Sequence, residues 1–157
     1  MLLVCFLVIA TPAHAAEPAS PPSVAVVPAP SQWLSDYDGI RLALVADDAS
    51  AATTAARSLA SSAGGDPDLA AAAVRVASAT DTTAQRSAFS ELSRLVVLRA
   101  SAPGASRVLV YHCPMFAGFA YWIQPKAGIA NPYMGAAMPE CGEEVSMKAA
   151  ARAAVAR

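Results

Sequence analysis

Aspartates at helix-start positions divide the alanine-rich part of the chain into short segments. Asp48 precedes Ala49, Asp66 precedes Pro67, and Asp81 precedes a further run of polar and apolar residues. An aspartate carboxylate accepts hydrogen bonds from the free N–H groups of a helix start, and proline is favoured at the first helical position. These positions predict several short helices joined by short connections.

Apolar side chains recur at helical spacing in four windows between residues 31 and 102. Ser31 is expected to cap the first helix, which ends near Val45, and Gly64-Gly65 is expected to end the second. Four helices with short connections favour antiparallel neighbours. We therefore predict an all-α fold: an antiparallel up-and-down four-helix bundle with an irregular, turn-rich C-terminal segment. The expected core positions are Trp33, Tyr37, Ile40, Leu44, Ala52, Ala56, Leu59, Ala63, Leu69, Ala73, Val76, Phe89, Leu92, Leu95 and Val96.

The N-terminal segment is typical of an export signal. Met1 to Ala10 is almost wholly apolar but too short to span a bilayer, and Ala13-His14-Ala15 fits the small-x-small cleavage pattern. No Lys or Arg precedes the apolar run, so the usual positive start is missing. We predict a signal peptide over 1–15, a proline-rich linker over 16–30, and a single helical domain over 31–157 with no membrane span.

Export would change which reactive side chains remain. The predicted signal contains Cys5 and His14, so the mature chain keeps Cys113, Cys141 and His112. The predicted location is the periplasm, where cysteine pairs tend to be oxidised.

Composition argues against two classes of function. The formal net charge is -1, so no basic surface for nucleic acid is indicated. The sequence also lacks the Gly-rich loop that nucleotide-binding motifs place between a strand and a helix. We therefore expect neither a nucleic-acid partner nor an organic cofactor.

Soft metal ligands gather between residues 107 and 145, the predicted site segment. One Cys-Pro-Met run and one Met-x-x-Cys run each supply two sulfur atoms at short spacing. Thiolate and thioether sulfurs favour Cu(I) or Ag(I), and an imidazole is also an acceptable ligand, whereas a structural zinc site needs four Cys or His ligands. The predicted metal ligands are Cys113, Cys141, Met115, Met138 and His112.

A disulfide is the alternative use of the same two cysteines. Cysteines in an exported domain usually pair. A bond between Cys113 and Cys141 would close a loop of about 28 residues and stabilise the fold by roughly 3 kcal/mol. Both interpretations stay open, and a disulfide in the oxidised form with a Cu(I) site in the reduced form satisfies both.

The other predicted ligands also have structural interpretations. Met115, Met134 and Met138 are each compatible with core packing. Consecutive residues in an extended segment point to opposite faces, so His112 and Cys113 need not reach one ion. The same divergence argues against a cysteine nucleophile activated by this histidine, and no Cys-x-x-Cys motif is present, so we expect no enzyme activity.

The site segment resembles a bacterial family of exported domains of unknown function. Members of that family stand alone or are attached to the periplasmic adaptor subunits of copper and silver efflux systems. The resemblance extends from about Trp33 to Met147, and it departs from the family where the run between Met115 and Trp122 is shorter than in many relatives. It implies an α-helical domain that handles heavy metals, with an efflux adaptor as partner. The matching residues are His112, Cys113, Pro114, Met115, Trp122, Ile129, Asn131, Pro132, Tyr133, Gly135, Met138, Cys141 and Gly142.

Together these patterns predict a periplasmic domain that binds Cu(I) or Ag(I) for metal tolerance or efflux. The alternative is a disulfide-stapled structural or interaction module of an efflux assembly that binds no metal.

Overall fold

The computed structural model describes residues 32–63, 65–105 and 107–156. The predicted signal peptide, the proline-rich linker, the Ser31 cap and Gly64 lie outside the described residues. Within them the chain forms five α-helices, one short 3-10 helix and three β-strands. The helices are α1 (Gln32–Val45), α2 (Ala49–Ser62), α3 (Pro67–Ala77), α4 (Thr82–Ala100) and α5 (Met147–Val155), and the 3-10 helix is η1 (Gly135–Ala137).

The four predicted helices are confirmed, with bounds close to those expected. The carboxylate of Asp48 accepts a hydrogen bond from the backbone N–H of Ala51 at 2.8 Å, and Asp81 caps α4 in the same way through Ala84 at 2.8 Å. Asp66 accepts from Leu69 at 3.1 Å. Local capping chemistry therefore sets where these helices begin.

The predicted all-α four-helix bundle is wrong, because the described residues form a mixed α/β fold. After α4 the chain builds a three-stranded antiparallel sheet in the order β2-β1-β3. Val110 lies opposite Ile123 on one side and Val145 on the other, so β1 is the central strand. The strands are β1 (Leu109–His112), β2 (Tyr121–Gln124) and β3 (Glu143–Val145). The first two are rich in aromatic and β-branched residues, which fit a half-buried sheet.

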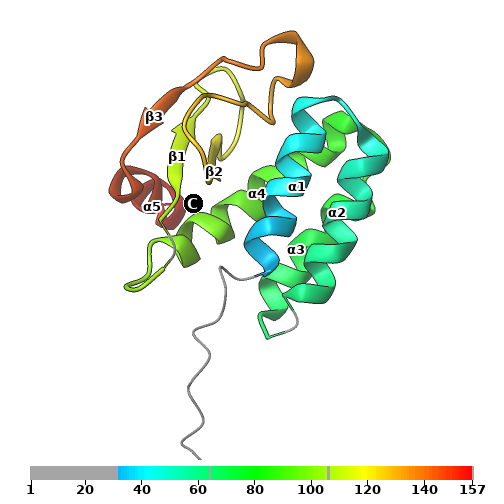
Figure 1. Ribbon diagram of the computed structural model, residues 1–157, viewed down its shortest axis with the longest axis horizontal. Helices are drawn as coiled ribbons and strands as arrows, with labels where there is room; N and C mark the ends of the chain where they lie inside the picture. The colour runs from blue at the N-terminus through cyan, green and yellow to red at the C-terminus, as the bar shows by residue number, and fades with distance from the viewer. Residues whose placement is uncertain (1–31, 64, 106, 157) are drawn as a thin grey trace, which may run out of the picture.

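Helix α4 is shared by the two halves of the fold (Figure 1). Helices α1, α2 and α3 pack on one another in sequence, and α3 packs on α4. On its other side α4 contacts β2 and α5. α1 has few contacts with α4, so the four helices do not close into a bundle around a common axis. Instead, the sheet and α5 cover the face of α4 that a closed bundle would have buried.

The core joins the two halves through aromatic side chains. Its largest fully buried members come from the helices, from β2 and from the connection that precedes β2: Trp122, Tyr37, Phe89 and Phe119. The rings of Tyr37 and Phe89 stack with their centroids 5.1 Å apart. Between α2 and α3 the buried residues are mostly alanines, which let the two backbones approach closely.

No helix in the described part of the chain is both long and apolar enough to cross a bilayer.

Candidate functional site

Cys113 follows the central strand of the sheet and is completely buried, with an exposed fraction of 0%. Its backbone N–H donates to the carbonyl of Ala120 at 2.9 Å, which extends the pairing of β1 with β2 by one residue. Pro114 comes next, and a residue before proline favours the extended conformation. The strand and the proline together hold the thiol inside the core.

Cys141 lies in the second sulfur-bearing turn and is half-buried. Its N–H donates to the carbonyl of Met138 at 3.2 Å, which closes the turn. Gly142 follows with φ +143°, and a Cβ at this position would lie 2.9 Å from both the His112 carbonyl oxygen and the Trp122 ring. Glycine is therefore required where this turn passes over the end of β1.

The two cysteine side chains meet. Both thiols are free, and they lie close enough to influence each other electrostatically. Burial raises the pKa of the Cys141 thiol above its usual range, and the neighbouring Cys113 raises it further. The fold thus brings together the two sulfur atoms that the sequence separates by 27 intervening residues.

Asn131 is the residue that holds the Cys141 turn in place. It is fully buried, and its side-chain amide donates to the carbonyl of Cys141 at 2.5 Å. Its side-chain oxygen accepts from the backbone N–H of Tyr133 at 2.8 Å, and its own N–H donates to the Pro139 carbonyl at 2.7 Å. One side chain therefore ties the Asn-Pro-Tyr turn to the cysteine turn. The sequence shows a turn here but gives no sign of this contact.

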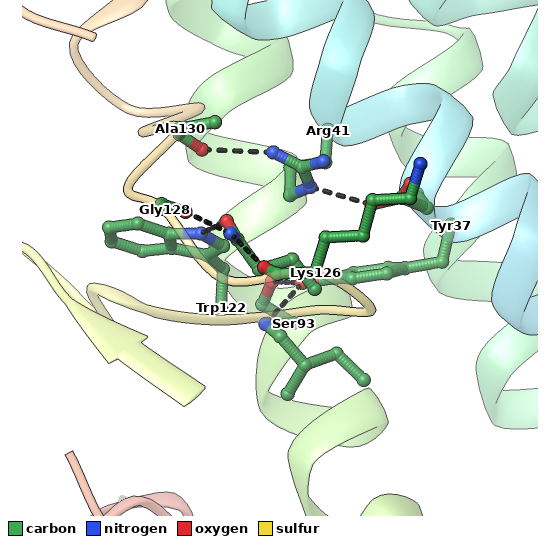
Figure 2. Close-up of polar contacts among 10 residues, drawn as sticks. Tyr37, Arg41, Ser93, Trp122, Lys126, Gly128 and Ala130 are labelled. Carbon is green, nitrogen blue, oxygen red and sulfur yellow. Dashed lines mark hydrogen bonds and ion pairs between the residues drawn. The ribbon is translucent and has the colours of Figure 1, made fainter. Parts of the chain in front are cut away.

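The helices fix the connector between the two sulfur turns through arginine side chains. Nη1 of Arg41 on α1 donates to the Ala130 carbonyl at 3.1 Å, as Figure 2 shows. Nε of Arg86 on α4 donates to the Pro132 carbonyl at 2.9 Å. Asn131 lies between these two anchored carbonyls, so the helical half of the fold positions the residue that positions Cys141.

Asp47 supplies a further anchor that the sequence did not indicate. It adopts a left-handed backbone conformation with φ 57°, and its carboxylate pairs with Arg86. The same carboxylate accepts from the backbone N–H of Ala136 at 3.0 Å. Gly135 has φ +59°, and a Cβ there would collide with both side chains of the ion pair. The capping role at the start of α2 belongs to Asp48, so Asp47 is free to make these other contacts.

A polar network lies under the Gly128 to Ala130 stretch (Figure 2). The indole N–H of Trp122 donates to the side-chain oxygen of Gln124 at 3.0 Å, and the Gln124 amide donates to the carbonyls of Lys126 and Gly128. These bonds fold the loop that follows β2 back onto the sheet and satisfy a buried glutamine.

Tyr37 connects α1, α4 and β2 at the centre of the same region (Figure 2). Its hydroxyl lies 2.5 Å from the Ser93 hydroxyl and accepts from the N–H of Ile123 at 3.4 Å. Burial raises the pKa of Tyr37, so this hydroxyl stays protonated at neutral pH.

His112 and the methionines are placed differently from the thiol pair. Nδ1 of His112 lies 3.6 Å from a carboxylate oxygen of Glu143, and its ring packs on Tyr121 with a centroid distance of 4.5 Å. In the described residues no three His, Cys, Asp or Glu side chains gather in a metal-holding group, so His112 does not form one with the thiols. Met115 is 63% exposed and Met138 is 38% exposed.

Met138 lies in the same turn as Cys141. The Cys141 N–H donates to the Met138 carbonyl, so the predicted thioether ligand and the thiol belong to one turn. Met134 packs against the core, as its structural interpretation predicted. The candidate site is therefore a thiol pair, Cys113 and Cys141, with the exposed Met138 in the same turn as Cys141.

Comparison with known proteins adds no relative to this picture: no family model, no curated protein and no solved structure matches the chain.

Proposed function

We propose that this protein is an exported binder of a soft monovalent metal ion, Cu(I) or Ag(I), held between Cys113 and Cys141. The observation that carries the proposal is the proximity of two free thiols, one of them fully buried, from two segments far apart in the sequence. Two thiolates are soft ligands, and soft ligands select Cu(I) over the harder divalent ions.

The surroundings supply the other requirements of such a site. Met138 stands in the same turn as Cys141 and offers a thioether as a third ligand. The thiols must lose their protons to bind the ion, so metal binding releases protons and weakens as the pH falls. Zinc fits less well because the described residues lack a group of three or more His, Cys, Asp or Glu side chains.

Metal tolerance or metal delivery is the biological role we propose for this site. The resemblance of the sulfur-bearing segment to domains attached to copper and silver efflux adaptors supports a periplasmic location and an adaptor protein as partner.

Competition titration of the reduced mature protein with Cu(I) tests the proposal. We expect Cys113→Ser and Cys141→Ser each to weaken binding by well over about tenfold, or 1.4 kcal/mol. Met138→Leu should weaken it less. Met134→Leu is the matched control, because Met134 packs against the core, and it should leave the affinity unchanged. Binding that survives loss of both cysteines would overturn the proposal.

The disulfide-stapled module is the second candidate, and the same thiol contact favours it. Two thiols that already lie side by side need little movement to form a bond. Intact mass with and without reduction would show whether the pair is oxidised in protein purified from the periplasm. A fully oxidised protein whose reduced form binds no Cu(I) would favour the structural module over the metal site.

A further inference from the structure

The two thiols of the site differ in solvent exposure and in how firmly the backbone around them is held. Cys113 has no exposed surface and follows the central strand of the sheet, where its N–H is paired with Ala120. Cys141 is half-buried, and the turn that carries it includes the exposed residues Met138 and Glu140. Any ligand arriving from solvent therefore meets the second thiol first.

We infer that Cys141 is the exchange sulfur of the pair and that Cys113 is the retained sulfur. External soft donors, a thiolate of a partner protein or of a small thiol, enter and leave through Cys141. Cys113 stays in the core and completes each exchange. The metal half of this inference rests on the proposed Cu(I) site, whereas the thiol half stands without any metal.

The thiol reaction can be written with a disulfide of glutathione as the oxidant. The Cys141 thiolate attacks one glutathione sulfur, a mixed disulfide forms on Cys141, and one glutathione thiolate leaves. The Cys113 thiolate then attacks the Cys141 sulfur and expels the second glutathione thiolate. The protein pair loses two electrons and two protons, and glutathione disulfide gains them to become two glutathione thiols.

For the metal, the same asymmetry sets the order of ligand replacement. An incoming thiolate binds the ion from the side of Cys141 and displaces that ligand first. Cys113 is released last, because its strand is paired on both edges and its thiol has no exposed surface. The partner that receives the ion must therefore present a soft donor.

Mixed-disulfide formation in single-cysteine proteins tests the assignment without metal. Cys113→Ser leaves only Cys141 in the mature chain, and Cys141→Ser leaves only Cys113. With glutathione disulfide as probe, we expect the first variant to react at least about tenfold faster than the second under native conditions, because access controls the rate. In guanidinium chloride the two rates should become similar. Equal native rates, or a ratio that survives denaturation, would overturn the inference.

A labelling experiment on the unsubstituted protein tests the same inference in case either variant misfolds. A short exposure of the reduced mature protein to a substoichiometric amount of iodoacetamide, followed by peptide mapping, should place the first label on Cys141. A first label on Cys113 would contradict the assignment. Failure of this test leaves the Cu(I) proposal standing, and failure of the Cu(I) titration leaves the labelling order standing, so the two outcomes are distinguishable.

Discussion

At the scale of single residues, Asn131 holds the turn that carries the Cys141 thiol. Its amide donates to the Cys141 carbonyl, while its oxygen accepts from the N–H groups of Tyr133 and Met134. A buried amide that makes all of these bonds rigidifies the turn, and removing one partner leaves buried groups unsatisfied.

The substitution Asn131→Asp separates the two halves of this role. Aspartate keeps the acceptor for the Tyr133 N–H but loses the donor to Cys141. We expect it to lower the free energy of unfolding by about 1–3 kcal/mol and to shift the Cys113–Cys141 equilibrium with glutathione towards the reduced pair. Urea unfolding and thiol quantification measure the two effects.

Gln32→Ala is the control for this prediction, because the Gln32 amide bonds to Asp36 at the exposed surface of α1. It should change neither quantity appreciably. If Asn131→Asp lowered stability but left the thiol equilibrium unchanged, Asn131 would support the fold without positioning Cys141.

At the scale of elements, the sequence predicted the helices well and the sheet poorly. The starts of α2, α3 and α4 depend on an aspartate and on backbone groups within three residues of it, so they can be read locally. A strand depends on partners far along the chain. β3 is three residues long and pairs with β1 across more than thirty positions, so its residues carry almost no local signal.

The same distinction applies to the site. Cysteine and methionine are the side chains that soft metal ions prefer, so the sequence alone leads to the prediction of Cys113 and Cys141 as a pair. Their meeting depends on Asn131, whose role requires a contact that no spacing rule predicts. Asp47 was missed for a similar reason, because its partners on α4 and η1 are brought to it only by the complete fold.

The link between α3 and α4 gives a prediction about pH. Asp66 caps α3 and also pairs with Arg99 on α4. The Arg99 hydrogen bond holds the pKa of Asp66 below its usual value. A depressed carboxyl pKa stabilises the fold above the unfolded pKa, near 4, and this stabilisation is lost as the pH falls through the lower folded value.

Arg99→Met should therefore flatten the acid side of the stability profile. We expect the unsubstituted protein to lose more of its unfolding free energy between about pH 5 and pH 2.5 than the variant does. Urea unfolding across this range measures the difference. The control is Arg94→Met, which removes the pair with the exposed Glu91 and a hydrogen bond to the Ala154 carbonyl, and which should keep the acid slope. Equal slopes for all three proteins would show that the Asp66 pair contributes nothing measurable.

At the scale of the whole molecule, α4 makes the helices and the site segment one unit. Its side chains face α3 on one side and β2 and α5 on the other. Arg86 is the polar part of this connection, because it donates to the carbonyls of Leu44 and Pro132 and pairs with Asp47. Arg86 therefore links the end of α1 and the turn just after it to the Asn-Pro-Tyr turn beside the thiols.

Arg86→Met tests whether this coupling sets the chemistry of the site. Methionine keeps much of the buried stem but removes every donor, which leaves two carbonyls and a carboxylate without their partner. We expect a loss of stability of a few kcal/mol, with a weaker Cu(I) affinity and a less oxidised thiol pair at a given glutathione ratio. Arg57→Met, at an exposed position of α2, is the control and should alter none of the three. A variant that is less stable but keeps an unchanged thiol equilibrium would show that the sheet positions the cysteines without the helices. If stability, Cu(I) affinity and thiol oxidation all fell together, the helical half would be part of the site although the proposed ligands lie outside it.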